Sequence, residues 1–142
     1  MLRITKVFHF EMAHAIHGYT GACKNIHGHS YELHVSVSSD FTETSYIPSI
    51  GFVIDFKDIK KLVLDSVIEK FDHSLMLSPD FLKAHPQFSS SPNLVIFEAE
   101  PTAENLLLYI KNMLHKSLPD PIKLARLKLF ETKDSYAEWT AH

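Results

Sequence analysis

The sequence predicts an α+β fold in which two helices cover one face of a four-stranded antiparallel sheet. Two stretches near the N-terminus alternate between apolar and polar residues, two later stretches carry apolar residues at helical spacing, and two further strand-like stretches close the chain. The expected order is strand, strand, helix, helix, strand, strand. A length of 142 residues suits one domain spanning residues 1–142.

The first two expected strands lie in residues 2–15 and 29–39. Apolar residues occupy alternate positions in each, namely Leu2, Ile4, Phe8, Phe10 and Met12 in the first and Tyr31, Leu33, Val35 and Val37 in the second. Alternation with a period of two indicates half-buried strands, and we expect these two to pair antiparallel. The glycine-containing residues 17–25 are expected to form the loop between them.

Helix-start residues mark the two expected helices. Asp55 precedes the apolar stripe of the first helix, and Thr102 precedes that of the second. Residues 78–97 contain three prolines and are expected to form a loop that leads into a short apolar run, residues 94–97. Residues 122–131 and 136–141 read as the closing strands. A four-stranded sheet has two open edges, so we expect the chain to oligomerise.

Composition excludes several classes of protein. The formal net charge of -3 argues against broad nucleic-acid binding, which needs a basic face. No apolar run is long enough for a membrane span, and no N-terminal stretch resembles a signal peptide. Cys23 is the single cysteine, so no internal disulfide is expected. These features predict a cytoplasmic protein.

Three histidines near the N-terminus suggest a metal site. His14 has the parity of the apolar positions of the first strand, and His27 and His29 have the parity of Leu33. All three should therefore point inward from two neighbouring strands. Three imidazoles that leave a fourth position open are typical of a catalytic zinc site. The alternative is that they are ordinary half-buried histidines held by hydrogen bonds.

Several segments together resemble the 6-pyruvoyl-tetrahydropterin synthase family. The matching segments follow in order along nearly the whole chain: residues 10–14 (FEMAH), 23–31 (CKNIHGHSY), 51–56 (GFVIDF), 71–73 (FDH), 101–105 (PTAEN) and 130–132 (FET). Such an ordered set is much more specific than any one motif.

The resemblance implies a fold, an assembly and a set of roles. The fold would be the tunnelling fold, in which subunits join their sheets into a barrel, with hexamers and active sites between subunits. The implied roles are zinc binding for His14, His27 and His29, acid–base catalysis for Cys23 and for the pair Asp72 and His73, and anchoring of the pterin ring for Glu131.

The spacing of the cysteine favours one branch of the family. Three residues separate Cys23 from His27. This resembles the 6-carboxytetrahydropterin synthases of queuosine and deazapurine synthesis, whereas pyruvoyl-forming members usually have a longer spacing. The implied reaction converts 7,8-dihydroneopterin triphosphate into 6-carboxytetrahydropterin, with loss of triphosphate and acetaldehyde.

Two further residues are candidates for substrate contact. Lys24 lies beside Cys23 and is our first choice for a cation that meets the triphosphate, although most lysines are merely solvated. Thr102 reads first as a helix cap and second as a substrate contact.

Three other functions stay open. The chain could be a pyruvoyl-forming synthase, or a non-catalytic module that binds metal or pterin. It could also be an epimerase or aldolase acting on dihydroneopterin, although such enzymes usually work without metal. Iron or nickel could replace zinc on three histidines.

Overall fold

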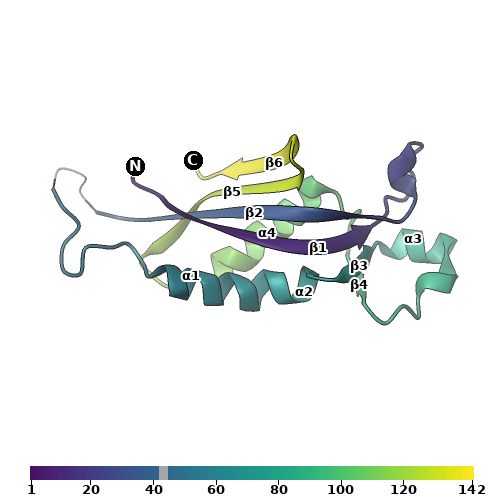
Figure 1. The fold of residues 1–142 in the computed structure, drawn as a ribbon, viewed down its shortest axis with the longest axis horizontal. Coiled ribbons are helices and arrows are strands. Elements are labelled where there is room, and N and C mark those ends of the chain that lie inside the picture. Colours follow the sequence, from purple (N-terminus) through teal and green to yellow (C-terminus); the bar gives the residue numbers. More distant parts are fainter. Residues whose placement is uncertain (42–44) are drawn as a thin grey trace.

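The computed structural model describes residues 1–41 and 45–142, which contain a six-stranded mixed sheet covered by helices. The strand order is β4-β3-β1-β2-β5-β6. The strands are β1 (Ile4–His14), β2 (His27–Ser39), β3 (Ser74–Leu77), β4 (Leu94–Ile96), β5 (Ile122–Thr132) and β6 (Ser135–Thr140). Figure 1 shows the long strands β1, β2 and β5 running side by side above the helices.

The centre of the sheet confirms the first two expected strands. β1 and β2 pair antiparallel along their whole length, from Ile4 opposite Val37 to His14 opposite His27. β5 pairs antiparallel with β2, and β6 pairs antiparallel with β5. The inward face of these strands supplies most of the buried apolar side chains of the sheet, among them Phe8, Phe10, Tyr31, Leu33, Val35, Leu127 and Leu129.

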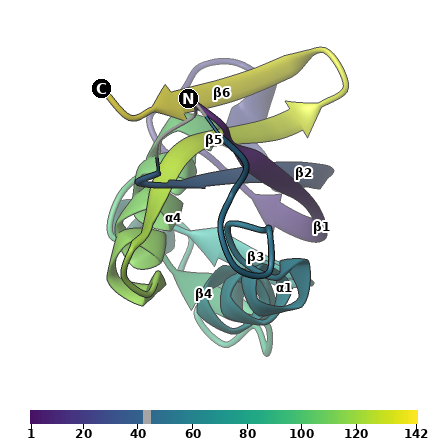
Figure 2. The same ribbon diagram turned by 90° about the vertical axis from the view of Figure 1, so that its left-hand side faces the viewer.

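Two helical segments cover that apolar face. The first runs through α1 (Phe56–Val63), a π-helical turn (Leu64–Ile68) and α2 (Glu69–Phe71), and it begins after Asp55, whose side chain accepts from the Lys57 N–H. The second is α4 (Ala103–Ser117), which Thr102 caps by accepting from the Asn105 N–H. Both predicted helix starts are confirmed. Figure 2 shows α1 and α4 on the same side of the sheet.

The predicted sheet was wrong in strand number and in pattern. β3 pairs parallel with β1, and β4 pairs parallel with β3, so the sheet is mixed and β1 is not an edge. All four residues of β3 are buried. A short strand buried on both faces shows no alternation, so periodicity could not reveal it. The edges of the sheet are β4 and β6.

The predicted loop at residues 78–97 was also wrong in part. It contains α3 (Pro79–Ala84), a 3-10 turn (Pro86–Phe88) and β4. Ser78 caps α3 by accepting from the Phe81 N–H, and Pro79 occupies the first turn of that helix. Proline is favoured at this position because its missing N–H would have no helical partner there.

None of the helices in the described ranges has the length and apolar character required to cross a membrane.

Candidate active site

The three histidines meet at one end of the β1–β2 ladder. His14 ends β1 and stands opposite His27, which begins β2, while His29 stands opposite Met12. Because side chains alternate along a strand, all three imidazoles project to the same face of the sheet as the apolar core. The structure therefore brings together the three residues that the sequence singled out, and their ligand atoms lie within 4.8 Å of one another.

Backbone carbonyls fix the orientation of two of these rings. The Nδ1 of His14 lies 2.7 Å from the carbonyl oxygen of Pro101, and the Nδ1 of His27 lies 2.7 Å from that of Asn25. A carbonyl oxygen can only accept, so each Nδ1 carries the proton and each Nε2 carries a lone pair. The two Nε2 atoms face each other at 3.0 Å. This is how metal-binding histidines are usually held.

Burial favours the neutral form of two of these imidazoles, those of His14 and His29. Loss of hydration lowers the pKa of His14, which is 2% exposed, and it also lowers the pKa of His29. The Nε2 of His29 is buried and finds no hydrogen-bond partner among the residues that the structure describes. A buried polar atom without a partner is costly, and converging lone pairs repel one another. A metal ion would relieve both problems, so this donor set fits a divalent cation of the zinc type.

Glu131 approaches the same cluster from β5. Its carboxylate oxygens lie 3.6 Å from the Nε2 of His29 and 3.9 Å from the Nε2 of His14. The side chain is 27% exposed. The register of β5 with β6 shifts between Phe130 and Thr132, so the regular ladder is broken beside Glu131. In the sequence Glu131 has the same parity as Leu127 and Leu129, which predicts the inward face, and the structure sets its carboxylate against the histidines.

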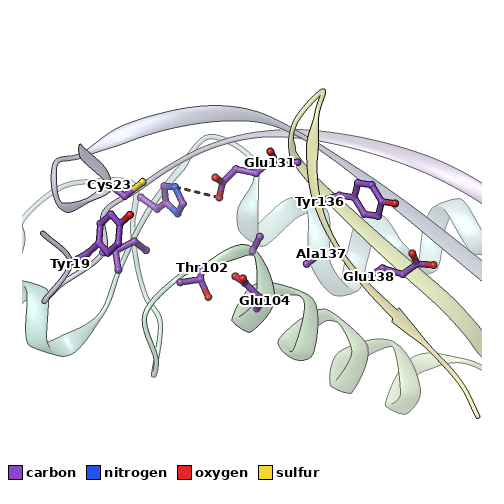
Figure 3. Close-up of a pocket in the computed structure, with 12 residues that line it drawn as sticks. Tyr19, Cys23, Thr102, Glu104, Glu131, Tyr136, Ala137 and Glu138 are labelled. Atoms are coloured by element: carbon purple, nitrogen blue, oxygen red, sulfur yellow. Dashed lines mark ion pairs between the residues drawn. The ribbon is translucent and has the colours of Figure 1, made fainter. Parts of the chain in front are cut away.

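A cavity of about 500 Å³ opens beside this cluster. Its lining includes His14, Cys23, Thr102 and Glu131, and also Tyr19, Glu104, Tyr136 and Glu138. Figure 3 shows Cys23 and Tyr19 on one side of the cavity and Thr102 and Glu104 on another, with a dashed line joining Glu131 to the histidine. Three glutamates line this cavity, and the described lining residues include neither lysine nor arginine.

Asp72 and His73 lie together but apart from Cys23. His73 adopts a φ of 60°, which turns the chain so that its Nδ1 comes 3.0 Å from the Asp72 carboxylate. The Glu11 N–H donates to the same carboxylate, and this hydrogen bond is the main cause that lowers the pKa of Asp72. His73 lines a separate depression that also contains His29. Among the described cavities of one chain, none is lined by both Cys23 and His73.

The remaining candidate and several unexpected residues have clear positions. Lys24 is exposed in the 3-10 turn Ala22–Lys24 and is not among the residues that line the cavity. Sequence reasoning did not select Tyr19, Glu104, Tyr136 and Glu138 as cavity residues. The sequence around Glu104 indicates only an acidic residue in the first turn of a helix. No local pattern marks the other three, because their proximity to the cavity depends on the tertiary fold.

These features define a mixed-sheet α+β protein with a candidate metal site beside a cavity that contains a cysteine and a glutamate. The chain belongs to the 6-pyruvoyl tetrahydropterin synthase family, whose sequence profile matches residues 3–142.

Individual proteins and structures agree with this family membership. The 6-carboxy-5,6,7,8-tetrahydropterin synthase of Rickettsia bellii is 32% identical over 97% of this chain and 99% of its own length. The dihydroneopterin monophosphate aldolase of Pyrococcus furiosus is 31% identical over 86% of this chain and 82% of its own length. The structure of Caenorhabditis elegans 6-pyruvoyl tetrahydropterin synthase is 22% identical and shares the fold, with a TM-score of 0.68 over 99% of this chain and 96% of that one.

Proposed function

We propose that the chain, acting as one domain over residues 1–142, is a zinc-dependent 6-carboxy-5,6,7,8-tetrahydropterin synthase. Its substrate would be 7,8-dihydroneopterin triphosphate, and its products 6-carboxytetrahydropterin, triphosphate and acetaldehyde. The observation that carries the proposal is the meeting of three histidine nitrogens with Glu131 beside a cavity that also contains Cys23. The full-length similarity to the Rickettsia bellii synthase supports the carboxy branch.

The three histidines would hold the metal through their Nε2 atoms. When bound, zinc supplies a Lewis acid that polarises the side-chain oxygens of the pterin and so makes the neighbouring C–H groups more acidic. The carbonyls of Pro101 and Asn25 keep the rings of His14 and His27 in the tautomer that binds a metal. Iron or nickel would fit the same donors, so the metal itself needs to be measured.

Cys23 is the proposed base on the cavity side. It lines the cavity together with His14 and is partly exposed, so a substrate bound there could meet its thiol. The thiolate is the reactive form, and a nearby divalent cation favours it. Its position in a short polar turn next to Lys24 separates it from the apolar core.

Asp72 and His73 are the proposed second acid–base pair. Asp72 is held by the Glu11 N–H, and it accepts from the Nδ1–H of His73, which leaves the lone pair on Nε2 of that ring to take up a proton and return it. Because this pair and Cys23 do not share a cavity in one chain, we propose that active sites form between the subunits of an oligomer, a hexamer by resemblance. The open edges β4 and β6 are where sheets could join.

Glu131, Thr102 and Lys24 are the proposed substrate contacts. The Glu131 carboxylate can accept from the amino group and ring N–H of a pterin, and Thr102 lines the same cavity. Lys24 is exposed beside Cys23, where a triphosphate could meet it. Because the cavity lining contributes acids and no lysine or arginine among the described residues, we expect further phosphate-binding cations to come from a neighbouring subunit.

Product analysis tests the proposal. Metal-loaded protein is incubated with 7,8-dihydroneopterin triphosphate, and the products are identified by mass spectrometry. We expect 6-carboxytetrahydropterin and acetaldehyde. We also expect a fall in kcat of about 10²–10⁴-fold in Cys23→Ala, with metal content unchanged. A 6-pyruvoyl product would move the chain to the other branch, and no turnover would favour a non-catalytic pterin-binding or metal-binding module.

A second candidate function is aldol cleavage of a dihydroneopterin phosphate. The 31% identity with the Pyrococcus furiosus aldolase favours it, and so does the acidic lining of the cavity, which suits a substrate with fewer phosphates. The two reactions leave different phosphorus products. The synthase releases inorganic triphosphate, whereas an aldolase leaves the phosphate ester on the released aldehyde. Phosphorus NMR of the same reaction mixture therefore separates them.

A further inference from the structure

We propose that Glu131 is a reversible fourth ligand of the metal. In the absence of substrate its carboxylate would complete the coordination that His14, His27 and His29 begin, and the bound pterin would draw it away. The displacement of Glu131 by the pterin rests on the proposed function. The binding of Glu131 to the metal in the absence of substrate does not.

The distances around the cluster suit a fourth ligand. Ligand atoms about 2.1 Å from a tetrahedral zinc ion lie about 3.4 Å from one another. The Nε2 atoms of His14 and His27 are 3.0 Å apart, and the oxygens of Glu131 lie 3.6 Å and 3.9 Å from the Nε2 atoms of His29 and His14. The two separations from Glu131 are too long for hydrogen bonds, and all three lie within about 0.5 Å of the edge length of a coordination tetrahedron.

The charges around Glu131 also require a cation. The ion pairs described for its carboxylate are with the Nε2 atoms of His14 and His29. Glu138 of the same cavity pairs with Arg126 and Lys128, whereas the ion pairs described for Glu131 include no lysine or arginine. An anion facing the lone pairs of neutral imidazoles is unfavourable unless a positive charge lies between them. A divalent ion at that point would bind all four groups.

The position of Glu131 also lets it leave. The residue lies at the irregularity of the β5–β6 pairing and lines the cavity, with its side chain 27% exposed. One carboxylate cannot bind the metal and also accept from both N–H groups of a pterin at its far edge. Substrate binding would therefore exchange one partner of Glu131 for another. When the pterin is present, the carboxylate leaves the metal and the fourth coordination position opens. Between turnovers the carboxylate occupies that position and keeps other ligands out.

Metal affinity without substrate tests the binding of Glu131 to the metal. Zinc affinity of Glu131→Gln is measured by competition with a chromogenic chelator and compared with the unchanged protein. Glu104→Gln is the matched control, because it removes one exposed carboxylate from the same cavity. We expect Glu131→Gln to lose about 10-fold or more in affinity, at least the effect of losing a second-shell partner. Glu104→Gln should change affinity much less. Unchanged affinity in Glu131→Gln, or an equal loss in both variants, would overturn the assignment.

The visible spectrum of the cobalt-substituted protein tests the displacement of Glu131 by the pterin. Coordination number and ligand type set the d–d bands of Co²⁺, so Glu131→Gln should differ from the unchanged protein when no pterin is present. Addition of 7,8-dihydroneopterin should change the spectrum of the unchanged protein, and the change should be much smaller in Glu131→Gln, which has no carboxylate to release. Identical Co²⁺ spectra for Glu131→Gln and the unchanged protein would contradict the ligand role. If the variant effects are seen but the triphosphate is not turned over, the ligand role stands and the proposed reaction fails.

Discussion

The two halves of the inward face of β2 serve different purposes. Tyr31 and Leu33 are fully buried and pack with the apolar core, whereas His27 and His29, on the same face and only a few residues earlier, belong to the polar cluster. The same alternation of side chains delivers both. What differs is the cover, because apolar helices lie over the middle of the strand and a cavity opens at its end.

This contrast shows how a rigid site is obtained from a stable core. The three histidines lie at the end of the β1–β2 ladder, next to fully packed residues of the same strands. Their backbone positions are therefore fixed by the same hydrogen-bonded register. Tyr31 links the two halves, because its ring stacks on Phe10 with a centroid distance of 4.9 Å and its hydroxyl lies 3.4 Å from the Nδ1 of His14. We therefore expect that substitutions can change the stability of the fold and the affinity for metal separately.

The largest expected effect falls on the core half. Leu33→Ala should lower the free energy of unfolding by about 2–5 kcal/mol, because Leu33 is fully buried and the cavity left behind cannot be refilled. Zinc affinity of the folded variant should stay near that of the unchanged protein. Urea denaturation and chelator competition measure the two quantities. A parallel loss of metal affinity would show that the two halves are not separable.

The next effect falls on the site half. His29→Ala should weaken zinc binding by at least about 100-fold, since a direct ligand should matter more than a second-shell partner. The stability of the metal-free protein should hardly fall, because the variant removes a buried nitrogen for which the described residues offer no hydrogen-bond partner.

The matched control for that experiment is His9→Ala, on the exposed face of β1. It should leave zinc binding unchanged. A metal-free His29→Ala protein that unfolds as readily as Leu33→Ala would contradict the division of β2 into a core half and a site half.

A smaller effect is expected at α4, which begins beside the cavity. Thr102 caps α4, and Thr102→Ala should cost about 1 kcal/mol of stability. Thr102→Ser keeps a capping hydroxyl and should restore most of that loss. If Thr102→Ala instead raised KM for the pterin substrate without a change in stability, its main role would be substrate contact.

The smallest effect is the pH dependence of the metal-free protein. Burial lowers the folded-state pKa of His14 and His29 below the ordinary histidine value of 6.5. The unfolded chain then binds more protons below pH 6.5, so stability should fall as the pH falls from 6.5 towards the lowered pKa values. Unfolding curves at several pH values measure this slope. His29→Ala should reduce it, and an unchanged slope would show that His29 does not contribute.

The sequence was most informative where structure is local and periodic. The parity of His14, His27 and His29 in two alternating strands placed them together, and Asp55 and Thr102 marked two helix starts, which the structure confirms. β3 was missed because four buried residues show no period and their parallel pairing with β1 is non-local.

The shape of the site was less accessible from sequence. Inward parity placed Glu131 on the correct face, but its approach to His14 and His29 depends on where β5 ends against β2 and β6. The separation of His73 from Cys23 depends on how β3 joins the sheet. Local sequence patterns indicate neither the approach of Glu131 to the histidines nor the separation of His73 from Cys23.

The most direct test of the account is a crystal structure of the zinc-loaded protein, with data collected at the zinc absorption edge. We expect one strong anomalous peak for each chain, about 2.0–2.1 Å from the Nε2 atoms of His14, His27 and His29. An ion bound elsewhere, or a cluster of histidines that stays metal-free at saturating zinc, would contradict it.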